Sequence, residues 1–409
     1  MPHRGLNHDE ALALGEHPVP TTDQTFEGLG LSEAILKCIQ HVGFKNPTPI
    51  QSAVIPPALK GEDIIGLAQT GSGKTAAFAL PIAERLMHGQ GLRGLILCPT
   101  REIALQTKAF LDLFGKHHHL TTVCLIGGVN MNPQITDLKK NPDLLIATPG
   151  RLYDHLNRRN VRLDRIQELV LDEADHMLDL GFLPQIENIV SHVPRQRHTM
   201  MFSATMPSAI ERLAQRFLHH PTRIDILPQG RAAEGITHRL YLVRDDMKKQ
   251  ALLALLHQEL GSTLVFTRTK VDATWLARVL EKEGQPVSHI HSDRSQRERT
   301  DALKGFREGE HRILVATDIA SRGIDVPGIQ HIVNFDIPQT VEEYIHRAGR
   351  TARANAVGLV STIATWLDKS MVRDIEKALE KELPRCTLPG VEPYTELKVK
   401  PFGRLRRRR

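Results

Sequence analysis

The chain has 409 residues, of which 41% are hydrophobic and 24% charged, and its formal net charge is +6 at pH 7. This length suits two globular domains rather than one core, and no apolar run approaches the length that spans a bilayer. The four cysteines form no CxxC pair, and the amino-terminal stretch lacks the apolar core of a signal peptide. We therefore expect a cytoplasmic protein without a membrane partner.

The first half of the chain alternates short apolar runs with longer amphipathic stretches. Residues 1–23 are polar and are expected to form a disordered tail. Beyond them, stretches such as 74–87 and 101–114 have helical periodicity. The apolar runs between the helical stretches are DIIGLA, GLILCPT, TTVCLIGG, DLLIATPG, ELVLDEAD and TMMFSAT. The pattern predicts an α/β domain over residues 24–227, with a parallel sheet, helices on both faces and ligands at the carboxyl ends of the strands.

The alternation pauses in a stretch rich in Pro, Gly and Ala, where residues 228–235 are predicted to be a linker. It resumes with STLVFTRT, VSHIHS, RILVATD, IQHIVNFDIP and GLVSTIA, which predict a second α/β domain over 236–384. Residues 385–409 are expected to be an extension, and the stretch 383–400 to lie extended over the second domain. The extension ends in KVKPFGRLRRRR, with seven Lys or Arg and no acid. Such a tail attracts polyanions, so nucleic acid is the favoured partner and a merely solubilising tail the alternative.

The stretch AQTGSGKT has the context of a phosphate-binding loop, because it follows an apolar run and opens a helical stretch. Gly71 and Gly73 let the backbone approach phosphate oxygens, so that successive N–H groups point at the anion. Lys74 is expected to reach the outer phosphates, and the Thr75 hydroxyl to face a magnesium ion. Ala68 stands where the general pattern has Gly, a mild departure. The first domain is therefore predicted to bind a nucleoside triphosphate.

An acidic motif follows the buried strand predicted over 169–171. Magnesium prefers carboxylate and water oxygens, so Asp172 is predicted to hold the ion, largely through water. Glu173 is then placed to orient or deprotonate the attacking water. An acidic helix N-cap is the alternative, which Asp175 could partly be. The phosphate-binding loop in the same domain favours catalysis.

A cationic motif near the end of the chain, EEYIHRAGRTARAN, holds His346, Arg347, Arg350 and Arg353 within eight residues. A solvated helix face is the ordinary interpretation of such a charge run. Arginine is nevertheless suited to phosphate, because its planar fork pairs phosphate oxygens bidentately and keeps its charge.

The motifs AQTGSGKT, PTREIA, TPGR, DEAD, SAT, ATDIASRGID and HRAGRTAR occur in this order. By them the chain resembles the DEAD-box ATP-dependent RNA helicases of superfamily 2, from about residue 26 to about residue 382. The tail of the second domain and LVFTRTK are most similar to the bacterial RhlE-type branch. The resemblance implies two tandem RecA-like domains on a flexible linker, ATP and Mg²⁺ as cofactors, and RNA as partner. Hydrolysis on RNA-induced domain closure would separate short RNA duplexes or remodel RNA–protein complexes, with ribosome-assembly or RNA-decay proteins as further partners.

The resemblance also implies a nucleotide site. GFKNPTPIQ is similar to the family's Q motif, in which Gln51 reads the adenine edge, Phe44 stacks on the ring and Phe26 supports the pocket. A carboxamide is apt, since it can pair bidentately with N6 and N7 of adenine. The implied ATP-binding residues are Phe44, Gln51, Ala68, Gln69, Thr70, Gly71, Ser72, Gly73, Lys74, Thr75, Gly323 and Asp325.

The resemblance assigns catalytic and coupling roles as well. Arg350 and Arg353 would reach the γ-phosphate across the cleft, while His346 would join the water network near Glu173 and Arg347 would be structural. The implied catalytic residues are Lys74, Asp172, Glu173, His346, Arg350 and Arg353, and the implied Mg²⁺ ligands are Thr75 and Asp172. The SAT hydroxyls of Ser203 and Thr205 would bond to the acidic motif at Asp175 and couple hydrolysis to strand separation.

The implied RNA-facing residues are mostly Gly, Thr and Arg at strand ends. They are Pro99, Thr100, Arg101, Glu102, Gly127, Gly128, Thr148, Pro149, Gly150, Arg151, Thr267, Gln296, Arg299 and Thr317. Because aromatic residues make up only 4% of the chain, base stacking should contribute little. We expect RNA to be bound through phosphates and 2′-hydroxyls, with little sequence preference.

Two other functions stay open. A DNA-directed translocase of the same superfamily is disfavoured by the Gln51 motif and the lack of a DNA-tracking element. An ATP-gated RNA clamp or assembly platform with little unwinding would use the same motifs. Small residues replace the commoner ones at Ser292, Ser321, Ala348 and Ala352, and should tune closure or RNA contact. The stretch KHHHL is expected to be an exposed loop rather than a metal site.

Overall fold

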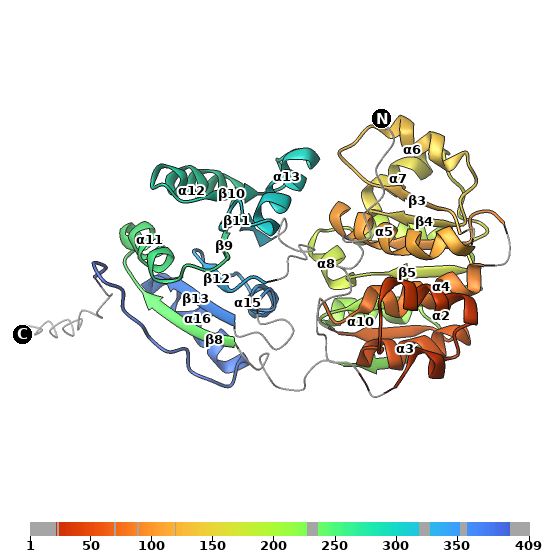
Figure 1. Ribbon diagram of the computed structural model, residues 1–409, viewed down its shortest axis with the longest axis horizontal. Helices are drawn as coiled ribbons and strands as arrows, with labels where there is room; N and C mark the ends of the chain where they lie inside the picture. The colour runs from red at the N-terminus through yellow and green to blue at the C-terminus, as the bar shows by residue number, and fades with distance from the viewer. Residues whose placement is uncertain are drawn as a thin grey trace, which may run out of the picture.

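The computed structural model describes residues 22, 24–68, 71–87, 90–118, 120–226, 236–318, 328–351 and 358–392, with all their side chains except those of 114–118, 296 and 342. Two α/β domains stand side by side (Figure 1). Helix α8 (Ala174–Asp179) of the first domain and helix α15 (Val341–Ala348) of the second lie on the facing sides. The predicted linker, 228–235, lies outside the described residues. Among the described helices, none combines the length and apolarity that crossing a bilayer requires.

Within the described residues, the first domain contains a seven-stranded parallel sheet in the order β3-β4-β2-β5-β6-β1-β7. Its strands are β1 (Ile64–Leu67), β2 (Gly94–Leu97), β3 (Thr122–Leu125), β4 (Leu144–Ala147), β5 (Glu168–Leu171), β6 (His198–Ser203) and β7 (Thr222–Asp225). The central strands are buried on both faces, as their continuous apolar sequences predict. Edge strand β7 was not predicted, because its sequence TRID buries only Ile224.

Helices cover both faces of this sheet and create two cores. One core lies beneath helices α2 to α5, and the other beneath helices α7 to α10. The helices are η1 (Phe26–Leu29), α2 (Glu33–Val42), α3 (Pro49–Leu59), α4 (Lys74–Leu86), α5 (Arg101–His118), α6 (Met131–Leu138), α7 (Pro149–Asn157), α8, α9 (Leu183–Ser191) and α10 (Ser208–Phe217). The predicted doubly covered α/β domain is confirmed.

The second domain repeats this architecture with a six-stranded parallel sheet among its described residues, in the order β10-β11-β9-β12-β13-β8. Its strands are β8 (Ile236–Leu242), β9 (Thr263–Thr267), β10 (Val287–Ile290), β11 (Ile313–Thr317), β12 (His331–Asn334) and β13 (Gly358–Ala364). Its helices are η2 (Asp245–Met247), α11 (Lys248–Gln258), α12 (Lys270–Lys282), α13 (Gln296–Arg307), α15, η3 (Trp366–Asp368) and α16 (Lys369–Ala378). Strand β8 was not predicted, because its polar, partly exposed sequence ITHRLYL forms a sheet edge.

Two local expectations need correction, and a third agrees with the structure. Helix α5 continues past residue 114 to His118, so His117 and His118 belong to its last turn and not to a loop. Thr22, assigned to the tail, donates its backbone N–H to the carbonyl of Pro47 (3.0 Å). The described part of the extension runs beside β8 as expected, since the N–H of Cys386 donates to the carbonyl of Leu240 (2.8 Å).

Buried histidines should make the second domain sensitive to acid. Burial lowers the pKa of His331 and of His238 to about 4, against an ordinary value of 6.5. Below pH 6.5 the unfolded chain therefore binds protons that the folded domain does not. The free energy of unfolding should fall as the pH drops from 6.5 toward 4.

Both tryptophans, Trp275 and Trp366, lie in the second domain, so their fluorescence reports its unfolding. Urea denaturation at about pH 7 and about pH 5 should show the loss of stability. His331→Gln should flatten this dependence, whereas His257→Gln, at an exposed position of α11, should preserve it. If the free energy of unfolding of His331→Gln depended on pH as steeply as that of the unchanged chain, His331 would not be a source of the acid sensitivity.

Candidate active site

The phosphate-binding loop joins β1 to α4 at the carboxyl edge of the first sheet. Gly71 and Gly73 both have positive φ, 85° and 92°. The Lys74 ammonium is buried and donates to the carbonyl of Ala68 (2.8 Å). Ser72 Oγ is buried without a hydrogen-bond partner in the described part of the chain, as expected where a bound phosphate would accept its proton. Gln69 and Thr70 lie outside the described residues, and Thr75 is partly buried in the first turn of α4.

Gly73→Ala should weaken ATP binding at least about tenfold. A Cβ at this position would lie 2.5 Å from Gln51 Nε2, and φ is 92°, where an L side chain is strained. The loop would have to move away from the phosphates to relieve both. Titration with a fluorescent ATP analogue measures the effect. Gly284→Ala, also at positive φ but with open space around it, should bind ATP normally, and equal affinity in both variants would argue against this loop.

The residues expected to read adenine pack against the loop. Gln51 Oε1 accepts from the backbone N–H of Thr48 (3.0 Å), and Gln51 Nε2 donates to the carbonyl of Gly73 (3.1 Å). The carboxamide therefore keeps one further donor and one further acceptor direction for an adenine edge. The ring of Phe44 stacks with Phe26 (centroids 6.4 Å apart) and also with Phe110 of α5 (6.1 Å), which the sequence did not indicate.

The acidic motif begins where β5 ends. Asp172 is 4% exposed, and its Oδ1 has no hydrogen-bond partner among the described residues. Burial raises the pKa of the Asp172 carboxyl and the neighbouring Glu173 raises it further, while the Lys74 ammonium opposes both. A cation would relieve this cost. A single buried carboxylate with an unpartnered oxygen fits an ion that takes its other ligands from phosphate and water oxygens.

The pKa of the Glu173 carboxyl, in contrast to that of Asp172, is lowered overall. Burial alone would raise its pKa, but the hydrogen bond from His176 Nδ1 to Glu173 Oε2 (3.1 Å) and the charges of His176, Lys74 and Arg350 lower it overall. The carboxylate is thus held ionised, as a base for water requires. His176 was not predicted. Its position three residues after Glu173, one helical turn on, was the available signal.

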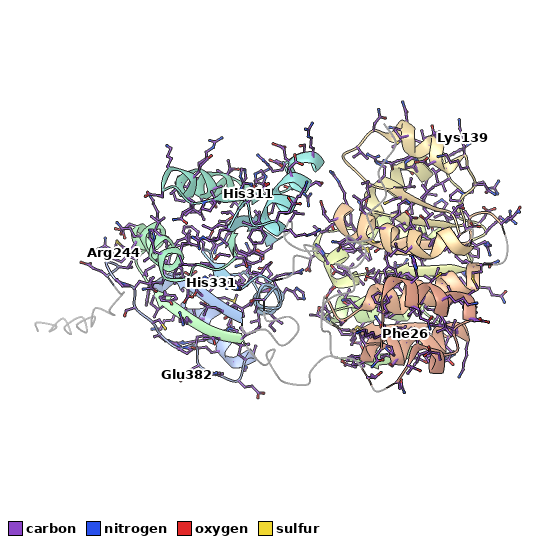
Figure 2. The ribbon with its side chains drawn as sticks, viewed as in Figure 1. Phe26, Lys139, Arg244, His311, His331 and Glu382 are labelled. Atoms are coloured by element: carbon purple, nitrogen blue, oxygen red, sulfur yellow. The ribbon has the colours of Figure 1, made fainter. Side chains whose placement is uncertain are left out.

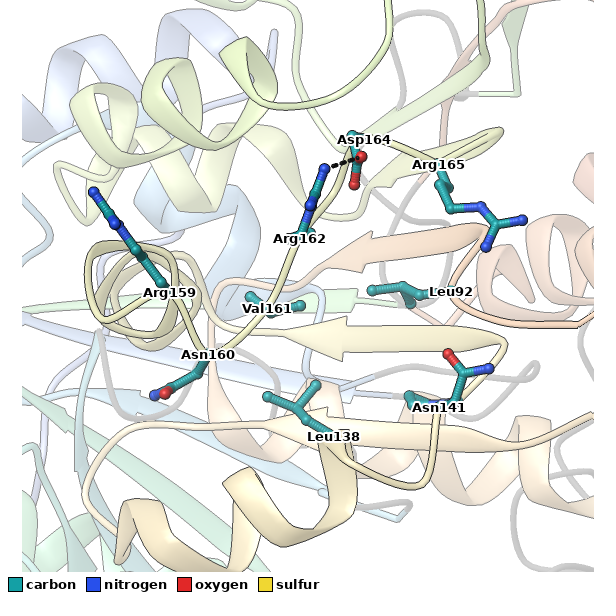
Figure 3. Close-up of a pocket in the computed structure, with 10 residues that line it drawn as sticks. Leu92, Leu138, Asn141, Arg159, Asn160, Val161, Arg162, Asp164 and Arg165 are labelled. Atoms are coloured by element: carbon teal, nitrogen blue, oxygen red, sulfur yellow. Dashed lines mark hydrogen bonds and ion pairs between the residues drawn. The ribbon is translucent and has the colours of Figure 1, made fainter.

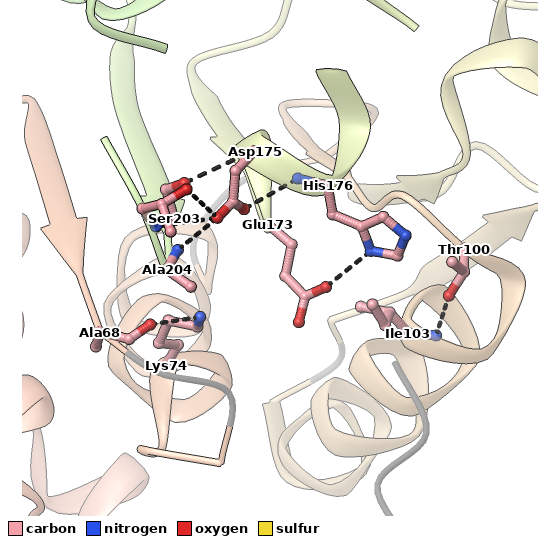
Figure 4. A network of polar contacts seen from close by, with 10 residues as sticks. Ala68, Lys74, Thr100, Ile103, Glu173, Asp175, His176, Ser203 and Ala204 are labelled. Carbon is pink, nitrogen blue, oxygen red and sulfur yellow. Dashed lines mark hydrogen bonds and ion pairs between the residues drawn. The ribbon is translucent and has the colours of Figure 1, made fainter. Parts of the chain in front are cut away.

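The SAT residues join the acidic motif through Asp175 (Figure 4). Asp175 Oδ2 accepts from the backbone N–H groups of Ala204 (3.1 Å) and Thr205 (3.0 Å) and from Thr205 Oγ1 (3.0 Å). The backbone N–H of Asp175 donates to Ser203 Oγ (3.4 Å). A shift of the acidic motif would therefore move the end of β6 with it.

The cationic motif approaches this site from the second domain. Arg350 is buried just beyond α15, and its charge is among those that lower the pKa of Glu173. That electrostatic contact crosses between the domains. His346 lies on α15, whereas Arg353, Gly323 and Asp325 lie outside the described residues.

Arg347 faces inward, as its expected structural role requires. It is 2% exposed. Its Nε and Nη2 each donate to a carboxylate oxygen of Asp318 (both 2.6 Å), and its Nη1 donates to Asn334 Oδ1 (2.9 Å) and to the carbonyl of Asp336 (2.7 Å). It thereby ties α15 to the ends of β11 and β12.

The arginines expected to face RNA gather near the ends of β2, β3 and β4. The Arg101 guanidinium occupies the space beside Gly128, where a Cβ would come within 2.1 Å of it. Burial and the charges of Arg299 and Arg151 lower the pKa of Arg101. Arg151 donates to the carbonyl of Val129 (2.9 Å). Three guanidinium groups this close favour an anionic ligand.

Arg299 differs from the expectation that it simply faces RNA. Its Nη2 lies 3.0 Å from Glu102 Oε1, with the side chains 10% and 9% exposed. This ion pair joins α13 of the second domain to α5 of the first, and no spacing in the sequence indicated it. The side chain of Gln296, the first residue of α13, is not described. The other residues expected to contact RNA lie at or just beyond the carboxyl ends of β2, β4, β9 and β11. They are Pro99, Thr100, Thr148, Gly150, Thr267 and Thr317.

Both domains are similar to those of known helicases. Residues 48–213 match the family DEAD/DEAH box helicase, and residues 247–355 match the family helicase conserved C-terminal domain. The chain is 39% identical over 396 residues to the DEAD-box ATP-dependent RNA helicase RhpA of Helicobacter pylori, covering 95% of this chain and 80% of that protein. It is 40% identical over 374 residues to CshA of Bacillus cereus, which carries the same description, covering 91% and 71%. Among solved structures, Saccharomyces cerevisiae Dbp5 bound to RNA and ADP BeF3 matches with a TM-score of 0.79 and 29% identity, covering 88% of this chain and 95% of that one.

Proposed function

The chain belongs to the DEAD-box ATP-dependent RNA helicases, and we propose that it separates RNA strands locally by closing its two RecA-like domains around ATP and RNA. As a member of this family it is an RNA-stimulated ATPase that converts ATP and water into ADP and phosphate. The proposal concerns how closure completes the active site and which residues act.

The observation that carries the proposal is the contact between the domains: Arg299 pairs with Glu102 (3.0 Å), and the buried Arg350 is one of the charges that lower the pKa of Glu173. With the domains apart, the phosphate-binding loop and the acidic motif lack this cation. With the domains together, Arg350 and Arg353 would stabilise the charge that develops on the transferred phosphoryl group. RNA that spans both domains would favour closure, which explains stimulation by RNA.

Each motif of the first domain has a role in this mechanism. The loop amides and Lys74 would bind the phosphates, and Gln51 would select adenine. Thr75 and Asp172 would hold magnesium, which when bound supplies positive charge to the phosphates. Glu173, kept ionised by His176, would orient the attacking water and take its proton. Asp175, bonded to Ser203 and Thr205, would transmit the change to the RNA-facing edge.

RNA would be held through its phosphates and 2′-hydroxyls, mainly by Arg101, Arg151 and Arg299. The low aromatic content supports binding with little sequence preference. Within the family, the motifs of the second domain favour the RhlE-type branch. Cytoplasmic location and partners in ribosome assembly or RNA decay belong to the same proposal.

ATP turnover with and without single-stranded RNA tests the proposal, with single-stranded DNA of equal length as the control. We expect strong stimulation by RNA and little by DNA. No stimulation by RNA would contradict RNA-driven closure, and equal stimulation by DNA would contradict selectivity for RNA. A short-duplex unwinding assay separates a helicase from an RNA clamp, because a clamp would hydrolyse ATP and retain RNA while leaving the duplex intact.

A further inference from the structure

A cavity of about 590 Å³ opens on the first domain, away from the active site (Figure 3). Its lining residues precede three strands of the parallel sheet: Leu92 comes before β2, Asn141 before β4, and the segment 159–165 before β5. The amino ends of these strands lie at the opposite edge from Lys74 and the other expected ligand-binding residues. A molecule bound here would therefore leave the ATP and RNA sites open.

The cavity combines an apolar floor with a cationic rim. Leu92, Leu138 and Val161 lie between Arg159 on one side and Arg165 on the other in Figure 3. Both side chains are exposed and form no hydrogen bond or ion pair within the described part of the chain, although the charge of Arg165 contributes to lowering the pKa of Asp164.

The rim also holds an internal ion pair, since Arg162 bonds to Asp164 (2.7 Å). The lining thus has three arginines and one aspartate, a net charge of +2. No aromatic side chain lines it.

We propose that this cavity docks an acidic segment of a partner protein that carries an aliphatic side chain. Arg159 and Arg165, which lie on opposite sides of the floor in Figure 3, would each pair with a carboxylate of the segment, and arginine pairs carboxylates bidentately. The leucine and valine floor would cover the aliphatic group, giving the apolar centre and charged rim of protein interfaces.

RNA fits the same surface less well. Its phosphates would use the arginines but leave the apolar floor in water. Its bases would find only the arginine planes to stack on, because no aromatic ring lines the cavity, and the leucine and valine floor would stay exposed to water. The combination of charge and apolar floor therefore favours a protein segment over a nucleic acid.

A defined peptide tests this proposal on the full chain. The probe is a fluorescein-labelled peptide of glutamates and glycines with two central leucines, and its match has serines in place of the leucines. Binding is followed by fluorescence anisotropy. The double variant Arg159→Glu/Arg165→Glu is compared with Arg195→Glu/Arg212→Glu, which changes the net charge equally at exposed positions of the same domain.

We expect the leucine peptide to bind the Arg159→Glu/Arg165→Glu variant at least about tenfold more weakly than it binds the unchanged chain. The Arg195→Glu/Arg212→Glu control should bind the peptide as tightly as the unchanged chain does. The serine peptide should bind the unchanged chain about tenfold more weakly than the leucine peptide. RNA-stimulated ATP turnover should be the same in all three proteins, which also shows that they are folded.

Equal loss of binding in both variants would mean general attraction between opposite charges. Equal affinity for both peptides would mean a polyanion site, open to RNA, and either result would overturn the proposal.

Discussion

Arg350→Ala should lower RNA-stimulated ATP turnover by about 10³- to 10⁵-fold while changing ATP affinity only a few-fold. The nucleotide is bound mainly by the first domain, whereas Arg350 enters from the second and acts electrostatically on Glu173. Its removal should leave ground-state binding nearly intact and weaken stabilisation of the transition state. Steady-state turnover at saturating RNA, together with titration of a fluorescent nucleotide, separates the two effects.

Arg373→Ala is the matched control, because Arg373 is an exposed arginine of α16 in the same domain. It should retain normal turnover. Tryptophan fluorescence melting should show that Arg350→Ala keeps a folded second domain. A turnover number within about tenfold of the unchanged enzyme would refute a catalytic role for Arg350, since arginine fingers contribute far more.

Arg347→Ala should destabilise the second domain by about 3 kcal/mol, toward the lower end of the cost of breaking a buried ion pair. Asp318 is 20% exposed, so water can relieve part of the lost pairing. The substitution also removes the hydrogen bonds to Asn334 and to the Asp336 carbonyl and the contact with the Phe266 ring, which lies 4.8 Å from the guanidinium. Urea denaturation followed by the two tryptophans measures the change.

Arg347→Lys keeps the charge but not the two-pronged geometry, so it should recover only part of the stability. Arg278→Ala, at an exposed position of α12, should be neutral within about 0.5 kcal/mol. A loss below about 1 kcal/mol in Arg347→Ala would place this arginine among ordinary surface ion pairs.

The parallel sheets and the phosphate-binding loop were accessible from the sequence because each depends on local pattern. Strands buried on both faces are continuous apolar runs, and the loop is a strand, a glycine turn and a helix start. The edge strands β7 and β8 lack the continuous apolar run of the central strands. A strand with one neighbour and a solvent-exposed face needs few apolar residues. Helix α5 was expected to end at residue 114, yet Gly115 does not interrupt it.

Apart from His176, which stands only three residues after Glu173, the parts of the site that escaped prediction depend on chain segments far apart in sequence. Glu102 and Arg299 meet only because two domains close on each other. Phe110 reaches Phe44 because α5 packs beside the loop that precedes α3. The cavity could not be predicted from the sequence for the same reason. No local pattern marks Leu92, Leu138 or Arg165, and only the parallel sheet brings them to one edge.

The pair between Glu102 and Arg299 has a consequence for how RNA affinity depends on salt. Each arginine that engages a phosphate normally contributes to the release of counterions from the nucleic acid, and the logarithmic salt slope counts these ions. Arg299 is already neutralised by a carboxylate from the other domain, so an RNA phosphate that takes it over must leave Glu102 with a cation from solution. That uptake would cancel the ion released from the RNA. The salt slope would then understate the number of arginine–phosphate contacts by one, because Glu102 acts as an internal counterion of Arg299 in the closed arrangement.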